Sequence, residues 1–232
     1  MKLKVLASGS DANSYILENE HEALIIEAGV SFKELVKYVE PRKIVGCVVS
    51  HKHKDHARYV EEYINLGIVV VKPYDTNSDL STGFKAGNFF LVPFKNYHNV
   101  PCYGFFINHR ACGKIVFATD TGYVNKNFSK AGISHWLIEC NYSKELLDKS
   151  VEDGIVNPIL ADRIVKDHMS IETCKTFFER NNLSKTRSIT LIHLSNNNSD
   201  AKQFQNVIHN QTGKDVYIAQ KGLEIDLSLY PL

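Results

Sequence analysis

The sequence has little of what marks secreted, membrane-spanning or strongly charged proteins. Its 27 basic and 26 acidic residues give a formal net charge of +1, so no overall charge draws it towards nucleic acid or an anionic membrane. No apolar stretch reaches the roughly 18 residues of a transmembrane helix, and residues 1–6 are too short and too alternating for a signal peptide. The five cysteines are odd in number and form no CxxC pair, which favours reduced thiols. We therefore expect a cytoplasmic protein that binds no membrane.

The length of 232 residues, with 44% hydrophobic and 23% charged content, suits a soluble protein with one sizeable core. No linker, repeat or low-complexity segment divides the chain, and we expect one domain over residues 1–232. Period-two and apolar runs predict strands, beginning with an N-terminal meander, at residues 2–7, 14–17, 23–26, 44–49, 68–71, 89–92, 103–107, 114–118, 135–139, 189–193, 216–219 and 223–227. Helical spacing and capping residues predict helices at residues 31–39, 57–66, 144–149, 158–166, 171–180 and 200–210. This order predicts an α/β fold, a four-layer αββα sandwich of two mixed β-sheets with outer helices.

A dense group of metal-ligand types follows the apolar strand at residues 44–49: His51-Lys52-His53-Lys54-Asp55-His56. If the backbone stays extended beyond the strand, the side chains of residues 51, 53 and 55 point the same way, and the turn into the next helix moves His56 out of line. His51 and His53 can then bind one metal, and Asp55 and His56 a second. Two metals about 3.5–4 Å apart clamp both sides of a hydrolytic displacement. The alternative is a charged, solvated turn after a strand.

A dinuclear site needs more ligands, and three further candidates stand at the ends of predicted elements. His98 precedes Asn99-Val100-Pro101, where the proline ends the element. Asp120 ends an apolar run and precedes Thr121-Gly122, and His193 ends the strand at residues 189–193. Taken alone, each has an ordinary alternative as a loop histidine, a turn former or a strand end.

Several polar residues have the chemistry to bind a phosphate. Ser8, Ser10 and Asn13 lie in a turn-rich loop whose hydroxyl and backbone N–H groups can donate to an anion, and Asn196 belongs to an asparagine cluster. His168 precedes a predicted helix N-terminus, which favours an anion. Plain turn chemistry is the alternative for the loop residues, and packing between two helices is the alternative for His168.

The order of these motifs resembles the metallo-β-lactamase fold hydrolases, whose HxHxDH signature is matched at all four ligand positions of residues 51–56. Within that superfamily the chain is more similar still to the YycJ/WalJ group of cytosolic nucleases. The likeness covers most of the chain and includes residues 7–10 with 13, residues 103–105 (YGF), 118–123 (ATDTGY), 139–142 (ECNY), 163 with 167–170, and 193–198 (HLSNNN).

The resemblance implies two metal sites that share one bridging carboxylate: His51, His53 and His98 at the first metal, Asp55, His56 and His193 at the second, and Asp120 between them. It also implies catalytic roles for Asp55 and for His168, which would lie beside the scissile phosphate. Glu27 replaces the aspartate usual in the group, and we expect it to support the metal loop from behind the ligands. Ala12 and Asp167 replace usual glycines, and Asp167 adds negative charge near the phosphate site.

The ligand set predicts hydrolysis by a metal-bridging hydroxide, with two divalent cations, zinc by preference or manganese. The resemblance implies a phosphodiesterase or nuclease, such as a 5′–3′ exonuclease on DNA or RNA, with nucleic acid as the partner. Two alternatives remain: a hydrolase of small cyclic phosphodiesters, lactones or thioesters, and a catalytically weak metal-containing binding module. The lactone and thioester hydrolases generally continue the motif with paired glycines, where this chain has Ala57-Arg58-Tyr59. Homo-oligomerisation is left open.

Overall fold

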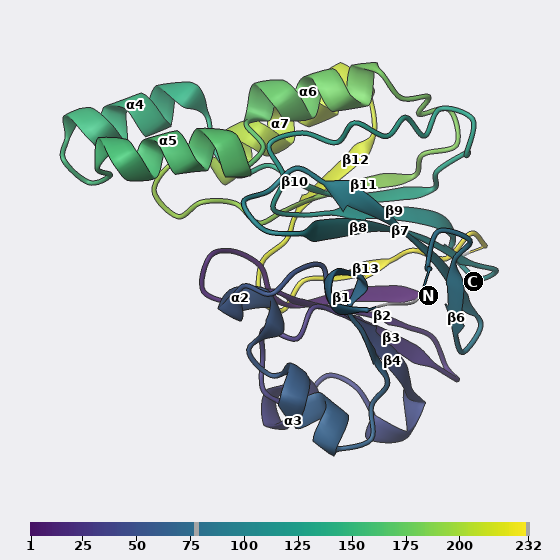
Figure 1. Cartoon of the computed structure of the whole chain (residues 1–232). Helices are drawn as coiled ribbons and strands as arrows, with labels where there is room; N and C mark the ends of the chain where they lie inside the picture. Colours follow the sequence, from purple (N-terminus) through teal and green to yellow (C-terminus); the bar gives the residue numbers. More distant parts are fainter. Residues whose placement is uncertain (77–78, 231–232) are drawn as a thin grey trace.

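In a computed structural model, which describes residues 1–76 and 79–230, two β-sheets pack face to face between outer helices (Figure 1). The first sheet has the strand order β13-β1-β2-β3-β4-β5, formed by Glu224–Asp226, Lys2–Ala7, Ser14–Glu18, Ala23–Ile26, Ile44–Val48 and Val70–Val71. Its first three strands in sequence form an antiparallel meander, whereas β3, β4 and β5 run parallel. The expected N-terminal meander is therefore present in a mixed sheet.

The second sheet is also mixed. It has the order β12-β11-β10-β9-β8-β7-β6, formed by Asp215–Ile218, Ser188–Ile192, His135–Glu139, Gly113–Ala118, Cys102–His109, Phe89–Asn96 and Phe84–Ala86. Strands β6 to β9 pair antiparallel, and β9 to β12 pair parallel. The carboxyl ends of β9, β10 and β11 consequently meet at one edge, which is where the polar residues gather.

Helices cover the outer face of each sheet (Figure 1). The first sheet carries the short helices α1, α2 and α3, at Phe32–Leu35, Lys54–Ala57 and Val60–Asn65. The second carries α4, α5, α6 and α7, at Lys144–Glu152, Pro158–Asp167, Ile171–Glu179 and Ala201–Thr212. Single 3₁₀ turns occupy Pro41–Lys43 and Pro73–Asp75. The predicted four-layer αββα architecture is confirmed.

The main core lies between the sheets. Leu3, Leu17 and Leu24 of the first sheet share one buried cluster with Phe105 and Phe117 of the second. A second cluster lies between the other face of the second sheet and its helices, centred on the buried Trp136. All five cysteines are buried and unpaired in the part of the chain described here. Within those same residues, no helix is both long and apolar enough to cross a membrane.

Two predicted helices differ from the structure. The helix expected at residues 31–39 is helical only over Phe32–Leu35, although Ser31 caps it as expected. The helix expected at residues 57–66 is divided into α2 and α3, and Tyr59 leaves the helical conformation between them. Neighbouring loops cause the division, because the carbonyl of Asp55 accepts from the N–H of Asn13 and the N–H of Tyr59 donates to Ala28 instead of continuing the helix.

Candidate metal centre

The seven expected ligands come from separate loops that meet at one edge of the sandwich. His51 and His53 follow β4, Asp55 and His56 lie on α2, and the remaining ligands follow β7, β9 and β11: His98, Asp120 and His193. The parallel ends of β9 and β11 bring Asp120 and His193 together, although 72 residues separate them in sequence.

The metal loop is extended only as far as His53. This residue has φ −63° and ψ 148° and is the N-cap of α2, and its carbonyl accepts from the N–H groups of His56 and Ala57. The expectation that Asp55 stays in line with His51 and His53 on an extended chain is therefore wrong, because Asp55 already lies in the first turn of a helix. The turn directs His51 and His53 to one group of ligand atoms and Asp55 and His56 to another.

The first group consists of three histidines. Nε2 of His51 lies 3.0 Å from Nδ1 of His53, and Nε2 of His98 lies 3.2 Å from the same Nδ1. Nδ1 of His51 is 2.9 Å from the hydroxyl of Ser50, which fixes the ring orientation. Three ring nitrogens so close together match the nitrogen ligands that zinc takes from histidine.

The second group mixes imidazoles and carboxylates. Nε2 of His56 lies 2.9 Å from Oδ2 of Asp55 and 3.0 Å from Oδ2 of Asp120. Nε2 of His193 lies 3.6 Å from Oδ2 of Asp55 and 3.8 Å from Oδ2 of Asp120. These four side chains offer ligand atoms that all lie within 4.8 Å of one another.

Asp120 faces both groups. Its Oδ1 lies 4.0 Å from Nε2 of His51 and 3.9 Å from Nε2 of His98, while its Oδ2 faces His56 and His193. Thr119 donates a 2.7 Å hydrogen bond to Oδ2 and helps to hold the carboxylate in place. One carboxylate oxygen directed at each group is the arrangement that a bridging ligand requires.

Buried polar atoms indicate that the site fits cations. Among the residues that the structure describes, Nε2 of His193, which faces the carboxylates of Asp55 and Asp120, is buried without a hydrogen-bond partner. A buried polar atom without a partner is costly, and native proteins rarely leave one unless it serves a ligand or a reaction. The donor set, the unpartnered His193 nitrogen and the convergence of four loops therefore suit two divalent cations.

The electrostatics of the two groups differ. Burial and the positive charge of His56 lower the pKa of His51 to about 2, so this imidazole stays neutral. Burial also opposes the protonation of His193, but Asp120, Asp55 and Glu139 outweigh it and raise its pKa to about 10. Since a metal ligand must be deprotonated, cation binding at the second group displaces protons.

Three of the residues in this centre have a left-handed backbone, which is uncommon for residues other than glycine. Glu27 has φ 68°, Asp120 has φ 49° and His193 has φ 56°; Glu27 and His193 directly follow a β-strand, and Asp120 is the second residue after one. The conformation turns the side chain away from the strand direction and into the centre. Because such backbone costs free energy, its concentration here points to a functional requirement.

Glu27 packs against the metal loop, and its expected role in supporting that loop stays a prediction. Its fully buried carboxylate accepts from the N–H of Ser50, at 3.3 and 3.2 Å, and Oε2 lies 3.4 Å from Nδ1 of His56. The carboxylate therefore lies at the Nδ1 edge of the imidazole, opposite the Nε2 that faces Asp55 and Asp120. A carboxylate in this position orients a ligating histidine.

Glu139 has a part in the centre that the sequence reasoning did not assign. Its buried Oε1 lies 2.7 Å from Nδ1 of His168 and 3.2 Å from Nδ1 of His193, and its Oε2 accepts from the N–H of Thr121 at 2.8 Å. The rings of His168 and His193 stack with centroids 5.3 Å apart. The available signal was a carboxylate at the end of an apolar strand, which is the same signal that identified Asp120.

The residues expected to bind phosphate occupy different positions. Asn13 is fully buried, and its amide lies 3.2 Å from Asp55 and 3.0 Å from the His56 ring. The Ser8 hydroxyl accepts from the N–H of His193 at 2.9 Å, so it holds a ligand-bearing strand end. Ser10 and Asn196 are exposed in turns. Their contacts with a substrate stay predictions.

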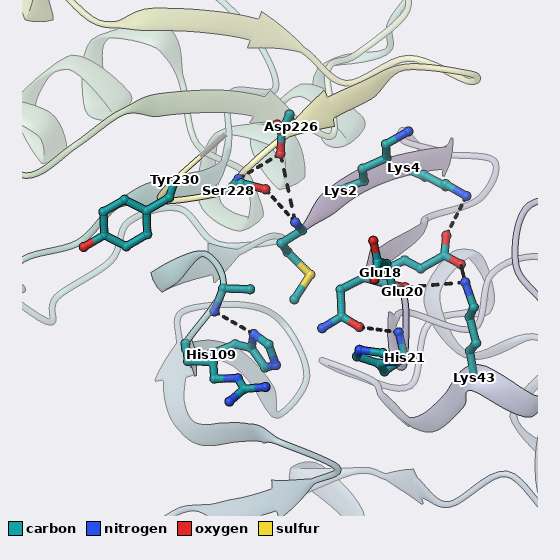
Figure 2. A pocket seen from close by; sticks show the side chains of 14 residues that line it. Lys2, Lys4, Glu18, Glu20, His21, Lys43, His109, Asp226, Ser228 and Tyr230 are labelled. Atoms are coloured by element: carbon teal, nitrogen blue, oxygen red, sulfur yellow. Dashed lines mark hydrogen bonds and ion pairs between the residues drawn. The ribbon is translucent and has the colours of Figure 1, made fainter. Parts of the chain in front are cut away.

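A cavity of about 640 Å³, whose lining side chains Figure 2 shows, lies near the N-terminus, at the end of the sandwich opposite α2 (Figure 1). Lys2, at the start of β1, lines it, whereas Ser8, just beyond the other end of β1, contacts His193. Much of its charge is neutralised internally, since Glu18 forms ion pairs with Lys4 and Lys43. This cavity is separate from the candidate metal centre.

No protein-family model matches the chain. The chain is similar to exodeoxyribonuclease WalJ of Streptococcus pneumoniae, with 26% identity in an alignment 260 positions long that covers 99% of this chain and 93% of the relative. It is 25% identical to exodeoxyribonuclease YycJ of Bacillus anthracis in an alignment 232 positions long that covers 86% of this chain and 84% of that protein. Among solved structures, the metallo-β-lactamase fold protein YhfI from Bacillus subtilis superposes with a TM-score of 0.71 at 15% identity, covering 97% of this chain and 98% of that one.

Proposed function

We propose that this chain, which has the metallo-β-lactamase fold and is similar along most of its length to the WalJ and YycJ exodeoxyribonucleases, is a dinuclear metal-dependent nuclease. It hydrolyses phosphodiester bonds of nucleic acid, and the names of these relatives favour DNA and removal of nucleotides from an end. Zinc is the preferred cation because histidines supply most of the ligands, and manganese also suits the carboxylates of the second group.

One observation carries the proposal: the two oxygens of Asp120 face two different groups of ligand atoms. Structural zinc sites are usually closed around one metal, so two adjoining groups joined by a carboxylate favour a catalytic centre. Two divalent cations bound there would lower the pKa of a water to near neutrality and neutralise charge on the attacked phosphate.

The protein's own residues then orient and move protons. Glu139 accepts a hydrogen bond from Nδ1 of His168, which fixes the ring and leaves its other nitrogen for the substrate. Burial lowers the pKa of His168, but the Glu139 charge outweighs it, so the net shift is upward and favours the protonated imidazole. His168 is thereby suited to contact the phosphate and to give a proton to the leaving oxygen.

The test is a panel of single- and double-stranded DNA and RNA, labelled at the 5′ or 3′ end and incubated with the purified protein and Zn²⁺, Mn²⁺ or Mg²⁺. We expect metal-dependent release of nucleotides, and none from the His53→Ala variant. Parallel assays use S-lactoylglutathione, a lactone and a β-lactam. A rate on one of these well above that on every nucleic acid would contradict the proposal.

A further inference from the structure

Two exposed tyrosines stack on each other beside the candidate metal centre. Tyr97 and Tyr123 have ring centroids 4.2 Å apart and planes inclined by only 18°. They are 46% and 44% exposed, although an aromatic side chain of this size normally contributes to a core. The metal centre described above uses neither residue.

The backbone fixes this pair next to the candidate ligands. Tyr97 immediately precedes His98, and Tyr123 follows Asp120 by three positions. The N–H of Tyr97 donates to the Thr121 hydroxyl at 3.0 Å, and the same hydroxyl donates to the carbonyl of Tyr123 at 2.7 Å. The carbonyl of Tyr97 accepts from Gly122 at 3.1 Å. The rings therefore stand on the two loops that also hold His98 and Asp120.

Basic residues belong to the segments next to the tyrosine loops. Lys126 follows Tyr123 by three residues, is exposed, and has its ammonium 5.8 Å from the centroid of the Phe94 ring. A Cβ at Gly122 would lie 2.6 Å from the carbonyl of Lys166, so the end of α5 touches the turn that carries Tyr123. Lys166 and Arg163 are exposed on this helix.

We propose that Tyr97 and Tyr123 form a stacking platform for a nucleobase of the substrate, next to the bond that is cut. Exposed aromatic rings flanked by cations are how proteins bind single-stranded nucleic acid without a strong sequence preference. Bases inside a duplex are already stacked on both faces, so the platform takes a base at a strand end, where one face is free. This inference rests on the proposed nuclease function and assigns a contact with its substrate.

The activity test combines changes on both partners. Single-stranded oligodeoxynucleotides each carry one abasic residue at the first, second or third position from the end that is degraded. For the wild type, an abasic residue at one of these three positions should raise KM at least about fivefold, which corresponds to the lower end of the energy range for one base–aromatic stack. The double variant Tyr97→Leu, Tyr123→Leu should raise KM on the intact strand by a similar factor. In this variant the abasic residue should cause no further increase in KM. Tyr97→Phe and Tyr123→Phe should preserve the wild-type behaviour.

Tyr230→Leu is the matched control, because Tyr230 is 87% exposed and lines the cavity at the opposite end of the sandwich (Figure 2). It should leave KM and the abasic effect unchanged. A penalty for the abasic residue that persists in the double Leu variant would overturn the platform.

A binding measurement tests whether the tyrosines stack on a base, independently of any cleavage. A strand with 2-aminopurine at the sensitive end is titrated with protein in chelator, and stacking should quench its fluorescence with the wild type but not with the double Leu variant. If no nucleic acid is ever cleaved, the nuclease proposal fails, and the quenching still shows whether the tyrosines bind a base. Equal quenching by both proteins would refute the platform even if the enzyme is an active nuclease.

Discussion

At the scale of single residues, His168 is proposed to transfer a proton and not to bind a metal. It stacks against His193 and belongs to neither the three-histidine group nor the group around Asp55, although it forms a third group of possible ligands with Asp120, Glu139 and His193. We expect His168→Ala to lower turnover by about 10²–10⁴-fold, the range for a lost acid–base group, because the leaving oxygen then departs without a proton. Turnover and metal content are measured on the same preparation.

The control for this change is His21→Ala, which removes an exposed imidazole at the far end of the sandwich and should alter neither quantity. A His168→Ala protein that turns over normally, or that loses metal, would show that the residue has a different role.

Glu139 should affect both proton transfer and metal binding, because it contacts His168 and His193. In Glu139→Gln the carbonyl can still accept from Thr121, but the charge facing His168 and His193 is lost. Residues that orient metal ligands typically change metal affinity by about 10–100-fold, and we expect a loss of that size here together with lower turnover. Calorimetric titration with zinc checks the affinity. Unchanged binding would mean that Glu139 serves only His168.

At the scale of elements, the centre depends on backbone contact between loops. A Cβ added at Gly29 would meet the carbonyl of Asp55 at 2.1 Å and the backbone of Asn13 at 2.5 Å. Neither can yield easily, because Asn13 and Asp55 are themselves joined by a 2.7 Å backbone hydrogen bond. We expect Gly29→Ala to displace α2 and to abolish metal binding at the second group, as measured by metal content.

Gly46→Ala provides the comparison on the same sheet. A Cβ there meets its nearest neighbours at 3.4 Å, which is ordinary contact, so metal content should be retained. Equal metal content in the two variants would contradict the importance of the Gly29 contact.

His135 in β10 contacts β11 and the segment after β13, and it should make the free energy of unfolding depend on pH. In β10, its ring lies 2.7 Å from the Ser188 hydroxyl of β11 and donates to the carbonyl of Leu227 at 3.0 Å. Burial lowers its pKa from 6.5 to about 4. The unfolded chain therefore binds this proton more readily, so the contribution to stability is complete above pH 6.5 and is lost as the pH falls towards 4.

The loss should amount to about 3 kcal/mol, at about 1.4 kcal/mol for each unit of pKa. Denaturant unfolding between pH 7 and 4 should show a shallower loss of stability in His135→Gln than in the wild type. Parallel curves for the two proteins would show that His135 does not titrate in this range.

The positions of most strands could be predicted from the sequence, but the extent of some helices could not. Strands such as β4 and β11 are continuous apolar runs, and burial on both faces leaves that pattern little freedom. The division between α2 and α3 depends on hydrogen bonds from Asn13 and Ala28, which are distant in sequence. Local spacing contains no information about such contacts.

At the scale of the whole molecule, cations should tie the two sheets together. The candidate ligands come from β4 and α2 on one sheet and from β7, β9 and β11 on the other. A cation that binds only the folded chain stabilises it, by about 2.7 kcal/mol at a hundredfold excess over Kd. We expect chelator to lower Tm by about 5–10 °C, following the usual 2–4 °C per kcal/mol at this size. Added zinc should reverse the change, whereas His53→Ala should show a much smaller response. A chelator-independent Tm would contradict two occupied sites.

The candidate site could be assembled from sequence because each expected ligand stands at the end of a recognisable element. Its supporting residues were harder to find. Glu139 is the last residue of an apolar strand. Its contact with His193 arises when β10 and β11 pair, and its contact with His168 arises when the turn between α5 and α6 packs against the end of β10. The paired tyrosines were equally hidden, since residues 97 and 123 meet only through the fold.

The left-handed backbone at Glu27, Asp120 and His193 has an evolutionary consequence. For an L-residue other than glycine this conformation costs about 1–2 kcal/mol, a cost that glycine avoids and that asparagine tolerates more readily. Stability and activity therefore favour different residues at these three strand ends, and only selection for the reaction keeps the carboxylates and the imidazole. In a lineage that no longer needs the enzyme, glycine and asparagine should accumulate at these positions while the core persists. The residue types at these three positions in a related sequence should therefore indicate whether that gene is still selected for catalysis.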